Sequence, residues 1–155
     1  MPPRPVRAGR DRSAAAFLTR RTSFAAAHRY RRPEWDAARN AAVFGACARP
    51  NFHGHTYVCD VTVTGPIDAT TGMIVDLAVL DRVLATEVHD HLDHRNLNLD
   101  VPAFAEGAGV VPTGENLARY IADRVQAALA SAKVTARVSE VRVAEDATLW
   151  STYRP

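Results

Sequence analysis

The sequence predicts an α+β domain in which an antiparallel sheet carries two helices on one face. Apolar residues alternate along segments near both ends of the chain, and two segments between them have apolar residues at helical spacing. The resulting order is strand, strand, helix, helix, strand, strand, which groups the strands around paired helices. A chain of 155 residues, of which 47% are hydrophobic, fits one domain with a buried core.

Two strands are expected in the first half of the chain. Residues 17–28 place alternate apolar side chains and His28 on one face of a strand. Residues 53–64 alternate in the same way, and a Gly-Pro pair ends that strand. The segment between them, residues 33–44, is expected to form a short helix or an ordered loop, with its proline in the first helical turn.

Two helices are expected in the middle of the chain. Asp76 is suited to cap a helix that extends to about residue 92, and Thr113 precedes a second helix that ends near Lys133. Each has apolar residues at helical spacing, which predicts one buried stripe per helix. The stripes consist of Leu77, Leu80, Leu84, Val88 and Leu92 in the first helix, and of Leu117, Ile121, Val125 and Leu129 in the second.

Two further strands are expected at about residues 136–145 and 148–153, joined by a tight turn at Glu145 and Asp146. A sheet of about four strands has two exposed edges, and exposed edges favour pairing between subunits. A homo-oligomer is therefore expected.

The first 15 residues are expected to form a disordered basic extension, and residues 16–155 a single domain. Residues 1–21 contain six arginines against one aspartate, so the net charge of +2 arises in this segment. This segment is accompanied by no DNA-recognition helix, and no aromatic residues alternate with its arginines. No specific nucleic-acid partner is therefore expected. No apolar run reaches the ~20 residues that span a bilayer, and no apolar signal segment is present. A cytoplasmic protein without membrane association is therefore expected.

Three histidines predict a metal site. His53 and His55 are two residues apart on a strand and point to the same face. If the first two strands pair as a hairpin, His28 lies opposite them. Three neutral imidazoles leave the fourth position of a tetrahedral zinc ion open, as in catalytic sites. A His-X-His pair alone is also explained as a chance polar pair on a half-exposed strand.

Cys47 lies in a loop six residues before His53. Near a zinc ion and Arg49, the pKa of its thiol is expected to fall, so that the thiolate can act as a base. The alternative is a buried, inert thiol. Cys59, in the middle of a strand, fits that alternative and is assigned no chemistry.

Three further groups of polar residues are candidates for the site. Adjacent Asp93 and His94 can pair as carboxylate and imidazole, although a solvated helix end also explains them. Glu145 ends the third strand in line with core residues, so its carboxylate can receive paired N–H donors from an amino-pyrimidinone ring, unless it lies in water. Thr113 and Glu115 are candidate substrate contacts, but capping of the second helix explains both equally.

Together these motifs resemble the 6-pyruvoyl-tetrahydropterin synthase / 6-carboxy-tetrahydropterin synthase family. The resemblance covers about residues 17–153, with the motifs in family order. The motifs are Ser23-Phe24-Ala25-Ala26-Ala27-His28, the Cys47 loop with His53-Gly54-His55, Thr71-Gly72-Met73, Leu92-Asp93-His94-Arg95-Asn96-Leu97, Thr113-Gly114-Glu115-Asn116 and Glu145.

The resemblance implies the tunnelling fold (T-fold), a four-stranded antiparallel sheet with two helices on one face. It implies subunits that assemble into barrels as trimers or hexamers, with active sites where subunits meet. It also implies one Zn²⁺ per subunit on His28, His53 and His55. The implied catalytic residues are Cys47, Asp93 and His94, and the implied pterin contacts are Glu145, Thr113 and Glu115.

The activity implied by the resemblance is the conversion of 7,8-dihydroneopterin triphosphate to 6-pyruvoyl-tetrahydropterin with elimination of triphosphate. The resemblance implies that zinc on the three histidines would supply a Lewis acid for the two side-chain hydroxyls, that the Cys47 thiolate would move a proton, and that Asp93 with His94 would make the second transfer. Magnesium often accompanies the phosphates in this family. Two residues depart from the family pattern: Gly114 stands where Thr, Ser or Ala is expected, and Asp146 stands where Thr is common.

Two alternatives remain. The sister activity, a 6-carboxy-tetrahydropterin synthase of the queuosine route, uses the same substrate and zinc. The five residues between Cys47 and His53 favour the pyruvoyl branch. A more remote alternative is a non-catalytic zinc-binding T-fold protein, against which the presence of Cys47, Asp93 and His94 argues.

Overall fold

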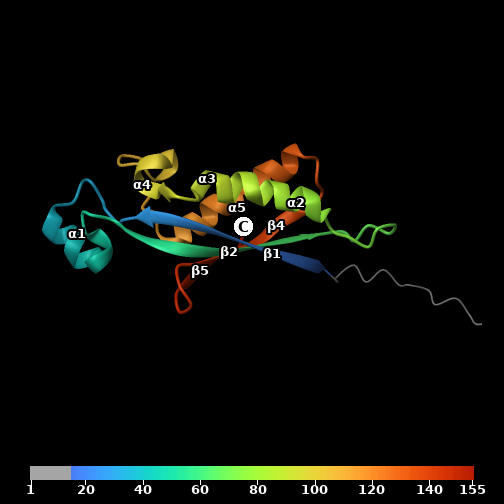
Figure 1. The fold of residues 1–155 in the computed structure, drawn as a ribbon, viewed down its shortest axis with the longest axis horizontal. Coiled ribbons are helices and arrows are strands. Elements are labelled where there is room, and N and C mark those ends of the chain that lie inside the picture. The colour runs from blue at the N-terminus through green and yellow to red at the C-terminus, as the bar shows by residue number, and fades with distance from the viewer. Residues whose placement is uncertain (1–14) are drawn as a thin grey trace, which may run out of the picture.

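The computed structural model describes residues 15–155 and contains one five-stranded sheet with helices packed on one face (Figure 1). The expected extension at residues 1–15 lies, except for its last residue, outside the described part of the chain. The strand order is β3-β1-β2-β4-β5. Four strands pair antiparallel with their neighbours, as predicted: β1 (Ala16–His28), β2 (His53–Gly65), β4 (Arg137–Ala144) and β5 (Trp150–Tyr153).

The sheet contains one strand more than the four predicted. β3 (Arg95–Asn96) pairs in parallel with β1, so the sheet is mixed. The backbone next to β3 is fixed to β1, because the N–H of His94 donates to the carbonyl of Ala25 at 2.6 Å. A strand of two residues is too short to show alternation in a sequence, and it forms here through contacts that are distant along the chain.

The helices α2 (Leu77–Leu84) and α5 (Gly114–Ser131) cover the same face of the sheet (Figure 1). The predicted N-caps are confirmed: the Asp76 carboxylate accepts from the N–H of Ala78 at 2.8 Å, and the Thr113 hydroxyl accepts from the N–H of Asn116 at 3.3 Å. The first helix is less regular than predicted. α2 continues into a π-helical segment, η2 (Ala85–His89), and then into α3 (Asp90–Leu92).

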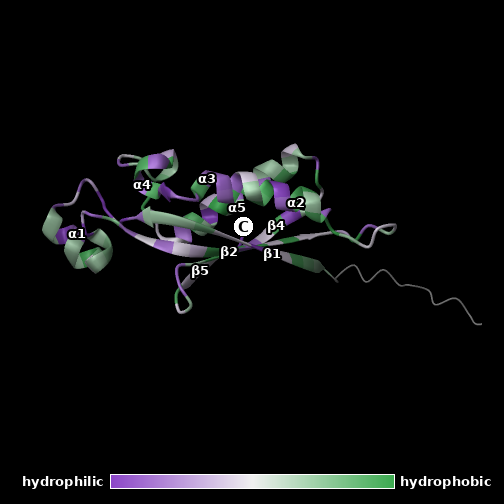
Figure 2. Ribbon diagram, in the orientation of Figure 1, coloured by the Kyte–Doolittle hydropathy of each residue, from purple (hydrophilic) through white to green (hydrophobic). Residues whose placement is uncertain are grey.

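The core lies between these helices and the sheet, and both layers contribute buried apolar residues; Figure 2 shows hydrophobic residues along the helices and the strands. Both predicted stripes are buried with one exception. Leu77 is 47% exposed because it is the first residue of α2, ahead of the turns that contain the buried leucines. The largest fully buried side chains include Tyr57, Phe24, Leu80, Leu92, Leu97, Leu117, Ile121 and Leu129.

The short helices α1 (Ala37–Phe44) and η1 (Gly45–Ala48) lie at one end of the β1–β2 hairpin (Figure 1). Asp36 caps α1 by accepting from the N–H of Arg39 at 2.7 Å, so this helix begins after the expected Pro33 position. Two further short helices, α4 (Leu97–Asp100) and η3 (Pro102–Phe104), follow β3.

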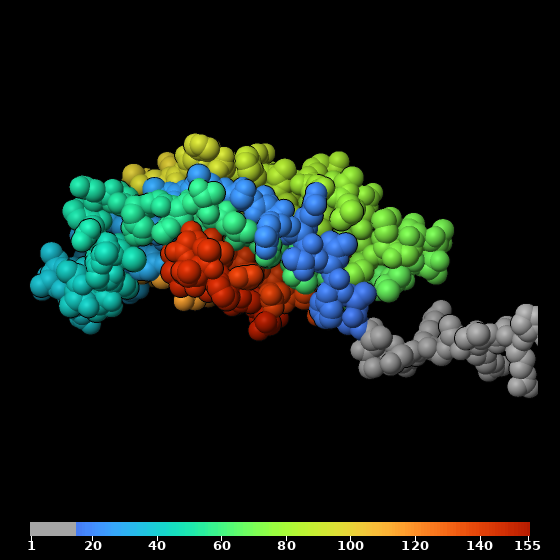
Figure 3. All heavy atoms as spheres, turned by 60° about the horizontal axis from the view of Figure 1, so that its bottom comes forward, coloured from blue at the N-terminus to red at the C-terminus, as the bar shows by residue number. Residues whose placement is uncertain are grey.

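The face that the helices leave uncovered is formed largely by the strands (Figure 3). Several large apolar side chains are exposed on the molecule, among them Phe17 and Trp150, which lie on β1 and β5. Among residues 15–155, no helix combines the length and hydropathy that crossing a membrane requires.

Candidate active site

The β1–β2 hairpin brings the three predicted histidines together. His28, the last residue of β1, pairs directly with His53, the first residue of β2. His55 lies two residues further along the same face of β2. One nitrogen from each ring can be chosen so that the three atoms all lie within 4.8 Å of one another. This geometry confirms the predicted convergence of the histidines on one point.

The orientation of His28 is fixed by buried partners. Its side chain is fully buried, with Nδ1 at 2.9 Å from the carbonyl oxygen of Pro112, and the hydroxyl of Tyr57 lies 3.1 Å from Nδ1 and 3.4 Å from Nε2. A carbonyl only accepts, so Nδ1 carries the proton and Nε2 keeps the lone pair that a metal needs. Burial lowers the pKa of His28 to about 4, so the imidazole is neutral near pH 7.

A nitrogen of His55 supports metal binding independently. Nε2 of His55 is buried and has no hydrogen-bond partner among the described residues. The Glu145 carboxylate lies beside it, with Oε2 at 3.6 Å. A buried polar atom without a partner costs about 1–3 kcal/mol unless a ligand satisfies it. The residues present therefore fit a metal ion with three nitrogen donors.

Glu145 lies at the end of β4 beside the histidines. Its side chain is only 9% exposed, and Oε1 accepts a hydrogen bond from the hydroxyl of Tyr30 at 3.3 Å. The start of α5 approaches this carboxylate closely at Gly114. A Cβ at that position would lie 2.7 Å from Oγ of Ser151 and 3.8 Å from Oε1 of Glu145. The close approach of β5 explains the glycine that departs from the family pattern.

Cys47 lies in η1 and is half-buried, with its carbonyl accepting from the N–H of Tyr30 at 2.8 Å. Burial raises the pKa of its thiol, and the Glu145 carboxylate raises it further. The fall in pKa expected beside a zinc ion and Arg49 stays a prediction, since the chain's own residues raise the pKa of this thiol. A metal ion bound at the histidines would add a positive charge that favours the thiolate.

Asp93 and His94 form the predicted pair, with Oδ2 of Asp93 at 2.7 Å from Nδ1 of His94. The second carboxylate oxygen accepts from the N–H of Ala25 at 2.7 Å. This hydrogen bond is the main cause that lowers the pKa of Asp93, and the hydrogen bond with His94 is the second cause. The His94 side chain is 84% exposed and lines an open groove beside β1 and β2. Within residues 15–155, no hydrogen bond or ion pair joins the pair to the three histidines.

Thr113 and Glu115 lie at the start of α5. Thr113 acts as the N-cap, and Glu115 is exposed in the first turn, as the capping interpretation expected. The preceding residue, Pro112, contacts His28, so this helix end lies at the histidine cluster.

Sequence reasoning missed three groups that shape the site: the hydroxyls of Tyr30 and Tyr57 and the carbonyl of Pro112. Tyr57 continues the same face of β2 after His55, and Tyr30 follows His28 by two residues. Both tyrosines could have been found from this alternation. The carbonyl of Pro112 could not, because a backbone acceptor has no signal in the sequence.

Comparisons with known proteins agree with this geometry. The family model described as 6-pyruvoyl tetrahydropterin synthase matches residues 17–155. The human 6-pyruvoyl tetrahydrobiopterin synthase is 44% identical over 121 residues, which cover 78% of this chain and 81% of the relative. The 6-carboxy-5,6,7,8-tetrahydropterin synthase of Bacillus subtilis is 35% identical over 111 residues, which cover 72% of each protein.

A solved structure extends the similarity to the fold. The Caenorhabditis elegans 6-pyruvoyl tetrahydropterin synthase superposes with a TM-score of 0.82 at 34% identity, covering 92% of this chain and 96% of that chain. With the family match over nearly the whole chain and the histidines in place, the chain belongs to the 6-pyruvoyl tetrahydropterin synthase family.

Proposed function

We propose that this chain is a zinc-dependent lyase that converts 7,8-dihydroneopterin triphosphate to 6-pyruvoyl-tetrahydropterin with elimination of triphosphate. The observation that carries the proposal is the histidine cluster, in which a buried nitrogen of His55 lacks a partner beside Glu145. The relatives named 6-pyruvoyl tetrahydrobiopterin synthase support the same activity. Residues 16–155 form the single catalytic domain in this proposal.

His28, His53 and His55 would hold the zinc ion, which when bound supplies a Lewis acid that acidifies the hydroxyls of the substrate side chain. The chain's own contribution is orientation. The carbonyl of Pro112 fixes the tautomer of His28, and burial keeps the imidazole neutral. Magnesium belongs to the proposal only as a companion of the substrate phosphates.

Glu145 is proposed to anchor the pterin ring. A carboxylate accepts two parallel N–H donors, the pattern that an amino-pyrimidinone edge presents. The hydroxyl of Tyr30 and the surrounding burial hold this carboxylate in place. Thr113 and Glu115, at the start of α5, are proposed to complete the pterin pocket.

Cys47 is proposed to move a proton of the substrate side chain, and the Asp93–His94 pair a second one. Asp93 orients His94 through the 2.7 Å contact and is itself held by the backbone of Ala25. His94 is highly exposed within one chain. We therefore propose a homo-oligomer, a trimer or hexamer, in which the pair serves the histidine cluster of a neighbouring subunit.

The experiment that tests this function is product analysis by mass spectrometry with pure 7,8-dihydroneopterin triphosphate and zinc-loaded protein. The expected products are 6-pyruvoyl-tetrahydropterin and triphosphate. The Bacillus subtilis relative supports a second candidate, formation of 6-carboxy-tetrahydropterin from the same substrate. If only that product and acetaldehyde appear, the second candidate replaces the first. Without any turnover, the chain would be a non-catalytic zinc protein.

A further inference from the structure

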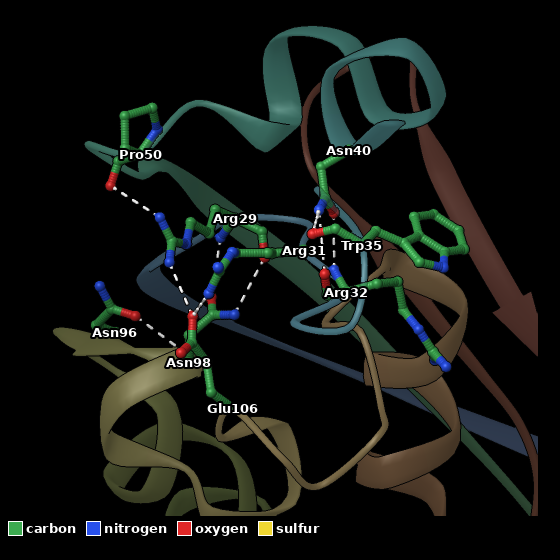
Figure 4. A network of polar contacts seen from close by, with 9 residues as sticks. All are labelled: Arg29, Arg31, Arg32, Trp35, Asn40, Pro50, Asn96, Asn98 and Glu106. Carbon is green, nitrogen blue, oxygen red and sulfur yellow. Dashed lines mark hydrogen bonds and ion pairs between the residues drawn. The ribbon is translucent and has the colours of Figure 1, made fainter. Parts of the chain in front are cut away.

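A cavity of about 580 Å³ lies between the segment that follows β1 and the short helices α1 and η1. Its volume falls in the range of ~300–1,000 Å³ that is typical of small-molecule sites. Three arginines line it, Arg29, Arg31 and Arg49, whereas Glu106 is the single carboxylate among the lining residues. Figure 4 shows two of these arginines converging on Glu106 below α1.

This cavity is distinct from the histidine cluster. Side chains alternate along the segment after β1, so that Tyr30 points toward Glu145 while its neighbours Arg29 and Arg31 line the cavity. None of the three histidines lines it. The chemistry proposed for the metal centre therefore leaves these guanidinium groups without a role.

Arg29 and Arg31 are held in place before any ligand binds. Both donate to the same oxygen, Oε1 of Glu106, with Arg29 at 2.9 Å and Arg31 at 2.5 Å. Arg29 also lies over the ring of Phe52, at 4.9 Å from its centroid, and its side chain is only 17% exposed. Hydrogen bonds from Arg31 and then Arg29 lower the pKa of Glu106, so one ionised carboxylate faces two positive charges.

Arg49 adds a third positive charge to the lining, next to Pro50, whose carbonyl accepts a hydrogen bond from Arg29 at 3.4 Å. It follows η1, is exposed, and takes part in no ion pair within residues 15–155. The lining therefore carries three positive charges against one negative charge. Guanidinium groups bind phosphate oxygens through paired N–H donors, and a cluster of them favours an anion with several charges and acceptor oxygens.

We propose that this cavity binds an oligophosphate, with Arg29, Arg31 and Arg49 as its ligands. A single carboxylate or monophosphate offers fewer oxygens than three guanidinium groups can engage. The oligophosphate has two potential sources: a free molecule in solution, or the triphosphate of the substrate. The second source rests on the proposed function, whereas binding itself does not.

The test is isothermal titration of the full chain with inorganic triphosphate at low ionic strength, without substrate. The double variant Arg31→Gln/Arg49→Gln is expected to bind at least about tenfold more weakly, because charge-assisted hydrogen bonds are lost. Arg119→Gln is the matched control, since this exposed arginine of α5 lies outside the cavity. Arg31→Lys keeps the positive charge but loses the paired donors. The affinity of this variant for triphosphate should therefore fall between the affinities of the wild type and of the double variant.

Absence of binding to the wild type, or equal affinity in the wild type and the double variant, would overturn the proposal. Circular dichroism and zinc content establish that each variant is folded.

Inhibition kinetics then distinguish the two sources of the oligophosphate, the substrate and a free molecule. Competitive inhibition by triphosphate, with a raised KM in the double variant, assigns the site to the substrate. Binding without competition assigns it to a free oligophosphate, and both results support the cavity as the site.

Discussion

The carbonyl of Pro112 accepts from Nδ1 of His28, which leaves the lone pair of Nε2 for a metal, and the hydroxyl of Tyr57 lies beside both nitrogens, at 3.1 Å from Nδ1 and 3.4 Å from Nε2. Such neighbours of metal ligands set the tautomer and the ring orientation. The two cysteines differ in how deeply they are buried, and burial raises the pKa of both thiols. Cys47 is half-buried next to the site, whereas Cys59 is fully buried and burial raises the pKa of its thiol to about 12.

Replacing Tyr57 by Phe removes the hydroxyl at His28 and keeps the ring, which stacks on Phe24 at a centroid distance of 5.0 Å. Loss of a partner of this kind typically lowers metal affinity about 10–100-fold, and we expect a loss within that range. Zinc competition with a chromogenic chelator measures it. Tyr153→Phe, on β5, is the matched control and should leave zinc affinity unchanged.

Cys47→Ala is expected to retain zinc and to lose turnover by roughly 10²–10⁴-fold, the usual contribution of a positioned base. Metal analysis and a steady-state assay on the same sample measure both properties. Cys59→Ala should keep turnover while losing stability, because that thiol only fills the core. Near-complete activity in Cys47→Ala would show that another group removes the proton.

Asp93→Asn tests a contribution to stability that depends on pH. The hydrogen bond from Ala25 and then His94 hold the pKa of Asp93 below its ordinary value of 3.8. A carboxyl group with a lowered pKa stabilises the fold above its ordinary pKa, and this stabilisation is lost as pH falls through the folded value. The difference in melting temperature between wild type and variant should be constant from about pH 7 to 5 and shrink below about pH 4. A difference that does not change with pH would contradict this assignment.

The regular elements could be predicted because local patterns determine them. Both N-caps, the two long strands and the stripe of α5 follow from alternation, helical spacing and capping chemistry. The π-helical segment η2 and the two-residue strand β3 could not be predicted. The position of β3 depends on contacts distant in sequence, namely the bonds between Ala25 and residues 93 and 94. The segment η2 keeps the helical spacing of buried residues, so the apolar pattern does not distinguish it from α2.

Two leucines of α2 that were both predicted to be buried differ in exposure, and they provide a matched pair of variants. Leu80 is fully buried, whereas Leu77 is 47% exposed. Leu80→Ala should lower the free energy of unfolding by about 2–5 kcal/mol, and Leu77→Ala by less than about 1 kcal/mol. Urea denaturation of both variants measures the difference. Equal costs would mean that Leu77 is covered in solution, as it would be in an oligomer interface.

At the scale of the whole molecule, the sequence predicts the sheet covered by helices and the convergence of the three histidines, since strand pairing places His28 opposite His53. It also predicts the Asp93–His94 pair. His94 and His55 line one open groove, but no hydrogen bond or ion pair within residues 15–155 joins the pair to the three histidines. The sheet ends in open edges at β3 and β5, and large apolar side chains such as Phe17 and Trp150 are exposed. These features support the proposed homo-oligomer.

The proposed function depends on three imidazoles that bind one zinc ion and leave one position open for the substrate. Anomalous diffraction at the zinc absorption edge, on crystals of the zinc-loaded protein, tests it most directly. One strong peak per subunit is expected at about 2.0–2.1 Å from one nitrogen each of His28, His53 and His55. A peak at other residues, or none between these rings at full zinc loading, would show that the three histidines do not form the zinc site.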